Sequence, residues 1–366
     1  MKKLIYFSRF LPTIDRGGGC HRMMQMLTAL SGFEVELVSA PRGDWLPENK
    51  LRHNAREVAV NVQSALARLS PAVDWGPDLN KMAIRFRSIA GQWADKLTAA
   101  KAPALVIIDD PIYFLPLYDR VKKLGLPVIA FCQNIESLSF VHPNVKSARA
   151  LLQQELETLA GCDEVVLLAQ EEDWLLRNLG QKPILFPYYP VQPLVDRLMA
   201  VRQARSGGAK NDVLLMGTAN NLPTRLGISE ALAFWGGACR ERLLVAGYNT
   251  GRYFENKTFP DNVRLLGELT NQQHDELLAR VKAVLCYQLS GSGALTRICE
   301  MLIAGVPVVA NRHAARSYHR LDGVHEFDTL ADLPKLLAGL PEQGEESAPP
   351  QPPDPGPLRA AIAKYL

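Results

Sequence analysis

The sequence predicts an α/β protein with two doubly wound domains, each built on a parallel sheet. Short apolar runs alternate with helix-length segments through most of the 366 residues. This alternation is typical of parallel sheets whose two faces are both covered by helices. The pattern restarts near residue 211, after a proline-rich hinge at 187–193, so a second series of strands opens there. An apolar fraction of 47% with 22% charged residues belongs to a globular chain that can bury two cores.

The expected strands are apolar on both pleat faces, as buried parallel strands are. They cover residues 4–8, 35–39, 105–109, 128–132 and 165–168, then 213–216, 243–246, 263–266, 284–287 and 306–310. The chain then divides into Rossmann-like domains at 1–190 and 191–340, a proline-rich linker at 341–357 and a C-terminal helix at 358–366. Leu358, Ile362 and Leu366 recur at helical spacing, which predicts one docked stripe on that helix.

Charge and cysteine usage narrow the class of partner and the compartment. A net charge of +3 creates no strong field for nucleic acid, so nucleic acid is not an expected partner. The six cysteines form no Cys-x-x-Cys pair and lie mostly in apolar runs, which indicates reduced thiols. No stretch approaches the roughly 20 apolar residues that cross a bilayer. We expect a cytoplasmic protein.

One segment leaves peripheral membrane contact open. Residues 81–101 place Met82, Phe86, Ile89, Trp93 and Leu97 at helical spacing with basic residues beside them. A basic amphipathic helix can rest on anionic lipid at the inner membrane face. The simpler interpretation is a helix that docks on its own sheet and exposes a solvated basic face.

The clearest chemical signal lies in the segment 289–309. It follows an expected strand, opens with small residues, continues as a helix and ends on Gly-x-Pro before another strand. A helix N-terminus of this kind presents backbone N–H groups and a positive dipole end to an anion such as a diphosphate. The loop and helix start comprise Gly291, Ser292, Gly293, Ala294 and Leu295.

The polar face of the same helix adds two charged groups. A helical wheel places Gly293, Thr296, Arg297 and Glu300 opposite the apolar face. Glu300 lies seven residues past Gly293, roughly 10 Å along a helix axis. A carboxylate at that offset can accept from the hydroxyls of a ribose while Arg297 faces a phosphate. The simpler interpretation leaves both residues merely solvated.

This segment resembles the donor-binding motif of the family-4-like glycosyltransferases (glycosyl transferases group 1). The resemblance implies the GT-B fold, in which two Rossmann-like domains flank a cleft. It also implies that the carboxylate aligned with Glu300 holds the ribose of a nucleotide diphosphate sugar. Weaker matches to the same family recur along most of the chain and imply further donor contacts. These fall on Gly18 and Gly19 after the first strand, and on Gly217, Thr218, Asn220, Asn221, Gly247 and Leu269 in the second domain.

Two departures from the family pattern bear on the sugar. Ser292 stands where many retaining members carry a second glutamate, and Gln133 stands where a histidine is usual. The run that contains Gln133, Asn134 and Glu136 resembles a sugar- or acceptor-binding stretch of the family. Serine and glutamine both hydrogen-bond sugar hydroxyls, so the departures are consistent with altered donor choice. Retention or inversion at the anomeric carbon stays open.

An inverting mechanism needs a general base near the acceptor hydroxyl. Ligands of open α/β sheets bind at the carboxyl ends of strands, which makes Asp110 and His21 candidates, with Asp109 and Glu136 as alternatives. Asp110 could instead serve as a helix cap or turn residue before proline, and His21 as a surface residue of a helix start. In a retaining mechanism the departing phosphate takes the proton.

We therefore expect a metal-independent, hexosyltransferase-type enzyme with no cofactor beyond its nucleotide-sugar co-substrate. The resemblance implies a glycan or lipid-linked acceptor and a role in bacterial surface polysaccharide biosynthesis. Two alternatives stay open, a nucleotide-sugar 2-epimerase on the same fold and a catalytically inert subunit. A nicotinamide dinucleotide site at 17–19 is disfavoured because the run fails the Gly-x-Gly-x-x-Gly spacing.

The ribose contact can be tested at one residue. We expect Glu300→Ala to weaken nucleoside diphosphate binding by a few kcal/mol at most, since hydrogen bonds to a charged group contribute about 1.5–3 kcal/mol each. Calorimetric titration of the folded variant measures this. An unchanged affinity would remove Glu300 from the site.

Overall fold

The computed structural model describes residues 3–15, 17–39, 93, 97, 105–139, 144–205, 211–319, 321–340 and 347–366. The chain divides into two compact units. Unit 1 comprises residues 1–187 together with 353–366, and unit 2 comprises residues 188–352. The domain boundary expected from the sequence, after residue 190, lies three residues later.

Unit 1 contains a six-stranded parallel sheet in the order β2-β1-β3-β4-β5-β6. The strands are β1 (Leu4–Ser8), β2 (Val35–Ser39), β3 (Leu105–Asp109), β4 (Val128–Cys132), β5 (Glu164–Leu167) and β6 (Ile184–Leu185). The helices are α1 (Gly18–Ala29), η1 (Pro111–Phe114), α4 (Leu115–Lys123), α5 (Glu136–Ser139), α6 (Val145–Ala160), α7 (Gln170–Asn178) and α15 (Gly356–Ala363).

Alternate residues of the unit 1 strands enter different cores. Leu4 and Tyr6 of β1 pack with α1 on one face of the sheet, whereas Ile5 and Phe7 pack with η1 and α4 on the other. Since successive side chains of a strand point to opposite faces, this division follows from the period of two. The apolar runs of the sequence therefore mark strands covered on both sides, as predicted.

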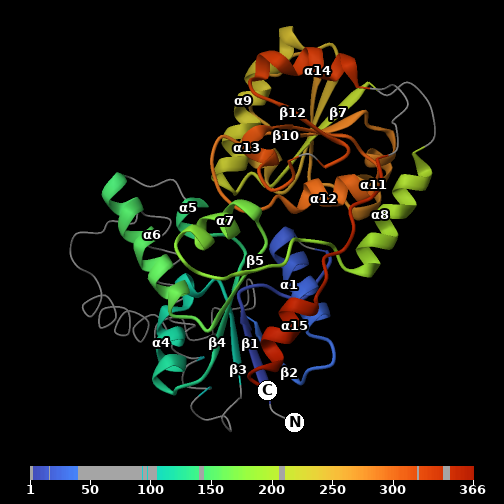
Figure 1. The fold of residues 1–366 in the computed structure, drawn as a ribbon. Coiled ribbons are helices and arrows are strands. Elements are labelled where there is room, and N and C mark those ends of the chain that lie inside the picture. The colour runs from blue at the N-terminus through green and yellow to red at the C-terminus, as the bar shows by residue number, and fades with distance from the viewer. Residues whose placement is uncertain are drawn as a thin grey trace, which may run out of the picture. The chain divides into compact units, whose positions relative to one another are not determined.

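The C-terminal helix α15 belongs to unit 1, although 165 residues of unit 2 separate it from the preceding part of that unit. Leu358 and Ile362 are fully buried in the same core as Met23 and Met26 of α1. In Figure 1, α15 (red) lies beside α1 (blue). The apolar stripe seen in the sequence is the docked face of this helix.

Unit 2 contains a second six-stranded parallel sheet, in the order β12-β11-β10-β7-β8-β9. Its strands are β7 (Asp212–Met216), β8 (Arg242–Ala246), β9 (Val263–Gly267), β10 (Ala283–Cys286), β11 (Val308–Asn311) and β12 (Val324–Phe327). Its helices are α8 (Gln192–Ala204), α9 (Leu222–Ala238), α10 (Thr250–Phe254), α11 (Asn271–Arg280), α12 (Thr296–Ile303), α13 (Arg312–Ala315), η2 (Leu330–Asp332) and α14 (Leu333–Gly339).

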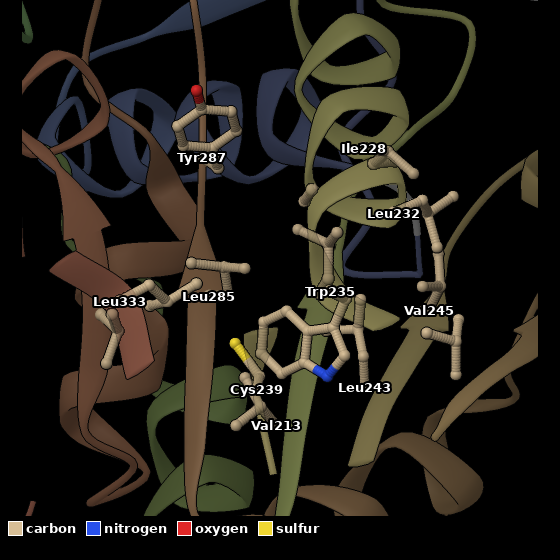
Figure 2. Close-up of a cluster of buried hydrophobic side chains, with 14 of the residues drawn as sticks. Val213, Ile228, Leu232, Trp235, Cys239, Leu243, Val245, Leu285, Tyr287 and Leu333 are labelled. Atoms are coloured by element: carbon tan, nitrogen blue, oxygen red, sulfur yellow. The ribbon is translucent and has the colours of Figure 1, made fainter. Parts of the chain in front are cut away.

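Trp235 of α9 occupies one core of unit 2. Its indole is fully buried, and Leu243, Val213 and Cys239 of the surrounding elements belong to the same cluster (Figure 2). The indole N–H donates to the carbonyl of Glu241 at 2.8 Å, so the polar atom of the ring is satisfied. This core holds α9 against β7 and β8, and thereby fixes the loop that precedes α9.

Two strands, β6 and β12, leave no clear strand pattern in the sequence. β6 is only two residues long, too short to show a period, and β12 carries the polar residues His325 and Glu326 at the sheet edge. The last predicted strand starts at Val308 instead of Val306, because Gly305 has a positive φ of 70° and Val306 N–H donates back to Met301. This is a helix C-terminal cap.

The predicted amphipathic segment 81–101 lies outside the described residues except for Trp93 and Leu97. Both are buried, and the Trp93 ring lies 5.1 Å from the rings of Phe7 and Phe114. These two residues therefore belong to a core of unit 1. Within the described part of the chain, no helix has the length and apolarity to cross a membrane.

The docking of α15 contributes to the stability of unit 1. We expect Ile362→Ala to lower the free energy of unfolding by about 2–5 kcal/mol, the usual cost of truncating a buried isoleucine. Urea denaturation measures the change. The control Ala360→Ser lies on the exposed side of the same helix and should change stability by less than about 0.5 kcal/mol.

Candidate functional site

The strand order of unit 2 defines where a ligand fits. The chain starts the sheet at β7, extends it to one side through β8 and β9, and continues on the other side through β10, β11 and β12. The loops that follow β7 and β10 therefore leave the same edge of the sheet in opposite directions. Open α/β sheets bind ligands at such a switch point, beyond the carboxyl ends of the strands.

The loop after β7 meets α12 at this edge. Gly217 lies against the Thr224 methyl group of α9 and against the Arg297 guanidinium, whose Nη1 would be 2.9 Å from any β-carbon at position 217. Glycine is thus required at 217 by packing. The structure brings Gly217 and Arg297, predicted as donor contacts from distant segments, next to each other.

The loop after β8 joins the same cluster. Gly247 has a φ of 134°, and a β-carbon there would collide with the carbonyl oxygen of Gly217. Asn249 donates through its side chain to Asn220 at 2.8 Å, and through its backbone to Glu268 at 3.1 Å. These bonds tie together the loops after β7, β8 and β9. Leu269, another predicted contact, follows β9 and is half-buried.

Helix α12 begins later than the sequence analysis expected. Its first residue is Thr296 and its N-cap is Leu295, so Gly293 belongs to the preceding loop, with a positive φ of 79°. Glu300 therefore lies about 6 Å beyond the helix start, one turn, instead of roughly 10 Å beyond Gly293. Gly291 and Gly293 both have a positive φ, which glycine adopts without strain. These glycines therefore form a turn before the helix and are not its first residues.

Arg297 is the central cation of this edge. Its buried Nε finds no hydrogen-bond acceptor within the described part of the chain. The side chain also hydrogen-bonds the Cys286 thiol at the end of β10, where burial raises the pKa of the thiol and Arg297 opposes the rise. A buried guanidinium donor without an acceptor costs free energy unless a ligand supplies one.

Glu300 contacts a residue that the sequence analysis did not select. The Tyr188 hydroxyl donates to Glu300 Oε1 at 2.6 Å, and Tyr188 is buried. Glu300 thus satisfies a buried phenol, so it is not merely solvated. Tyr188 is hard to recognise from sequence because it lies in the hinge, which has no helix or strand period.

Several predicted loop residues serve the fold directly. Asn221 caps α9 by accepting from the Thr224 N–H at 3.2 Å. The imidazole Nε2 of His313 lies 3.0 Å from the Gly291 carbonyl oxygen, which anchors the loop before α12. Thr218 is exposed, Ala294 is buried, and Ser292, Leu295 and Thr296 are half-buried.

Unit 1 has its own switch point, between β1 and β3, and buried polar groups gather there. The Tyr6 hydroxyl donates to Asp109 at 2.6 Å, and the Ser8 hydroxyl donates to the other carboxylate oxygen. Burial raises the pKa of Asp109 to about 8, with a further contribution from the neighbouring Asp110. Asp109 is therefore a buried carboxyl that favours its protonated form.

Arg9 joins the carboxylates at the ends of β3 and β4. Its Nη2 donates to Asp110 at 2.8 Å and to Glu136 at 2.9 Å, and its guanidinium lies 4.5 Å from the Tyr113 ring centroid. The Tyr113 hydroxyl also donates to Glu136, at 2.6 Å. Arg9 follows β1 directly, which is the only sequence signal that could have singled it out.

Asp110 is the predicted base that the structure surrounds most completely. It is 1% exposed and adopts a left-handed φ of 44°. One carboxylate oxygen accepts from the Gln133 N–H at 2.6 Å and the other from Arg9. Burial raises the pKa of Asp110 to about 7 although Arg9 opposes the rise. These contacts make Asp110 a link between the loops that follow β1, β3 and β4.

The remaining predicted residues of unit 1 surround the start of α1. His21 Nε2 lies 3.0 Å from the Ile14 carbonyl oxygen. Gly18 is the first residue of α1, and a β-carbon at Gly19 would overlap the Phe10 ring, so packing alone requires that glycine. The presence of glycine at position 19 is therefore not evidence for a ligand contact.

The run after β4 combines burial with polarity. Gln133 is buried, and its backbone and side-chain oxygens accept from Arg22 of α1 at 3.1 and 3.4 Å. Asn134 donates to Glu136 at 3.3 Å. The three residues predicted to bind sugar or acceptor thus form one connected group with Arg9 and Arg22. No set of three or more metal-ligating side chains occurs among the residues described.

Two parallel, doubly wound α/β units in tandem constitute the GT-B fold, which the sequence analysis predicted. Sucrose-phosphate synthase from Thermosynechococcus elongatus superposes with a TM-score of 0.58 at 14% identity, over 100% of this chain and 90% of that one. Anabaena Alr3699/HepE in complex with UDP and glucose gives 0.59 at 12% identity, over 100% and 99%.

TarM gives a TM-score of 0.51 at 15% identity over 76% of this chain, which spans only 55% of the length of TarM. No protein-family model and no curated protein matches the sequence. These likenesses establish the fold.

The buried carboxyls of unit 1 predict a dependence of stability on pH. The pKa of Asp109 in the folded protein is about 8, above its value in the unfolded chain. Proton binding by Asp109 therefore stabilises the folded state fully below about pH 4, and this stabilisation is lost as the pH rises through 8. We expect Asp109→Asn to gain stability relative to the wild type by up to about 4 kcal/mol between pH 5 and pH 8, at about 1.4 kcal/mol per pH unit.

Urea unfolding midpoints across this pH range measure the difference. The control Asp15→Asn alters an exposed loop and should follow the wild type. A stability difference for Asp109→Asn that does not change with pH would show that Asp109 is ionised throughout.

Proposed function

We propose that the protein is a glycosyltransferase that takes a hexosyl group from a nucleoside diphosphate sugar bound by unit 2. The observation that carries the proposal is Arg297, a cation with a buried Nε–H donor, set over Gly217 at the switch point of the sheet. Arginine binds phosphate oxygens through its planar set of donors. Arg297 as a residue is half-buried, so a diphosphate would accept from its terminal guanidinium nitrogens.

Two further features support a nucleotide at this place. The N-terminus of α12 presents backbone N–H groups beside Arg297. Glu300 lies one turn along, where a carboxylate can accept from ribose hydroxyls. Anabaena Alr3699/HepE, which resembles this fold, forms complexes with UDP and UDP-glucose. UDP-sugars are therefore the donors to test first.

In the transfer, the acceptor oxygen forms a bond to the anomeric carbon as the bond to the diphosphate breaks. Negative charge develops on the leaving diphosphate, and Arg297 with the α12 N-terminus would stabilise it. The acceptor proton must pass to a base. Since Asp110 is only 1% exposed and holds Arg9 and the Gln133 N–H, we assign that residue to holding the loops. A carbonyl only accepts, so His21 Nε2 carries the proton of its contact with Ile14. His21 and the leaving phosphate are our candidates.

The acceptor side is proposed on the resemblance. A glycan or lipid-linked acceptor, a role in bacterial surface polysaccharide assembly and metal independence all extend the family pattern to this chain. The residues we propose for the acceptor or transferred sugar are Gln133, Asn134 and Glu136. Mass spectrometry of reactions that pair nucleotide sugars with glycan and polyprenyl-linked acceptors tests transfer directly. Epimerised sugar and free nucleotide without acceptor would favour an epimerase, and binding without any turnover an inert subunit.

Arg297 provides the sharpest test of the donor site. We expect Arg297→Gln to weaken UDP binding about 10–100-fold, because charged hydrogen bonds contribute about 1.5–3 kcal/mol each. The affinity for uridine, which lacks phosphate, should change little. Arg312→Gln, an exposed arginine of unit 2, is the matched control. Equal losses for UDP and uridine would contradict a phosphate contact.

A further inference from the structure

The contact between Tyr188 and Glu300 joins two segments that are distant in the sequence. Tyr188 is the first residue of unit 2 and only 3% exposed, and its hydroxyl donates to Glu300 Oε1 at 2.6 Å. Burial, reinforced by the neighbouring carboxylate, raises the pKa of Tyr188 well above its usual value. The phenol therefore keeps its proton at physiological pH and acts as the donor of the bond.

The helix that carries Glu300 is itself held firmly. Ile298, Met301 and Leu302 are buried along its inner side. At its C-terminal end, Arg202 of α8 donates to the carbonyl oxygens of Leu302 and Ile303, at 2.5 and 2.8 Å. With the backbone fixed, the conformation of the Glu300 side chain is the freedom that remains. The Tyr188 hydrogen bond restricts that freedom.

We propose that Tyr188 is a positioning residue that orients the Glu300 carboxylate toward the 2′ and 3′ hydroxyls of the donor, so that the pair selects ribonucleotide over 2′-deoxyribonucleotide sugars. The proposal rests on the proposed function. A carboxylate has about four acceptor positions, so the bond from Tyr188 does not prevent Glu300 from accepting from a diol. Orientation before binding matters because a mobile side chain loses rotamer freedom when it is immobilised by a ligand.

A purely structural role makes a different expectation. If the bond only satisfied a buried phenol, its loss would change stability and would affect every nucleotide to the same extent. If it orients Glu300, its loss should affect ligands in proportion to their use of the ribose diol. The ratio of affinities for UDP and 2′-deoxy-UDP distinguishes the two roles. Both affinities are measured on the same variant, so a general loss of stability cancels in the ratio.

The experiment is calorimetric titration of the full-length protein with UDP and 2′-deoxy-UDP, or with the pair of another base if the wild type prefers one. We expect the wild type to favour UDP. Tyr188→Phe should weaken UDP binding about tenfold, an effect the size of one charged hydrogen bond. It should weaken binding of 2′-deoxy-UDP, which keeps only the 3′ hydroxyl, about threefold. Tyr189→Phe, the same change at the adjacent half-buried residue, should alter neither affinity.

A second comparison shows whether Tyr188 acts through Glu300. In a Glu300→Ala background, which lacks the acceptor for the Tyr188 hydroxyl, Tyr188→Phe should cause no additional loss of UDP affinity. Equal losses for UDP and 2′-deoxy-UDP, an unchanged UDP affinity, or a full additional loss in the Glu300→Ala background would each overturn the proposal. A wild type that binds none of the nucleoside diphosphates would instead overturn the proposed function, and this inference with it.

Discussion

The structure depends on one constraint, that a parallel sheet must be covered on both faces. Strands such as Leu4–Ser8, whose alternate residues enter different cores, cannot leave either face in water. The chain therefore crosses from strand to strand through helices, and every strand of a sheet ends at the same edge. Where the order of strands reverses, two loops part and leave room. Both candidate sites arise at such a reversal, β1–β3 in unit 1 and β7–β10 in unit 2.

Close backbone packing fixes the loops at the edge of the unit 2 sheet. Gly217 and Gly247 bring the ends of β7 and β8 together so tightly that neither position accommodates a side chain. The space above Gly217 is taken by Arg297, and α12 presents Glu300 one turn later. The cation and the carboxylate are thus arranged by the same helix, and Tyr188 from the hinge completes the arrangement. The residues that pack this edge are the same few that we propose bind the donor.

The corresponding edge of unit 1 differs because its charged side chains are buried and contact one another. Removing carboxylates from water is costly unless each oxygen is hydrogen-bonded. Asp109, Asp110 and Glu136 meet this requirement through Tyr6, Ser8, Arg9, Tyr113 and the Gln133 N–H. This hydrogen-bond network links the loops that follow β1, β3 and β4 and holds them in one geometry. Because the side chains of the network are largely enclosed from solvent, we infer that they position these loops.

The sequence by itself determined the α/β class and most of the strands, and it singled out the segment that contains Arg297 and Glu300 as the candidate donor site. Apolar runs and small-residue loops are local signals, and burial on both faces leaves a readable pattern. It could not show that α12 starts at Thr296, that Arg297 lies on Gly217, or that Tyr188 and Arg9 hold carboxylates far along the chain. Those contacts are between residues that only the folded sheets bring together, so no periodicity in the sequence records them.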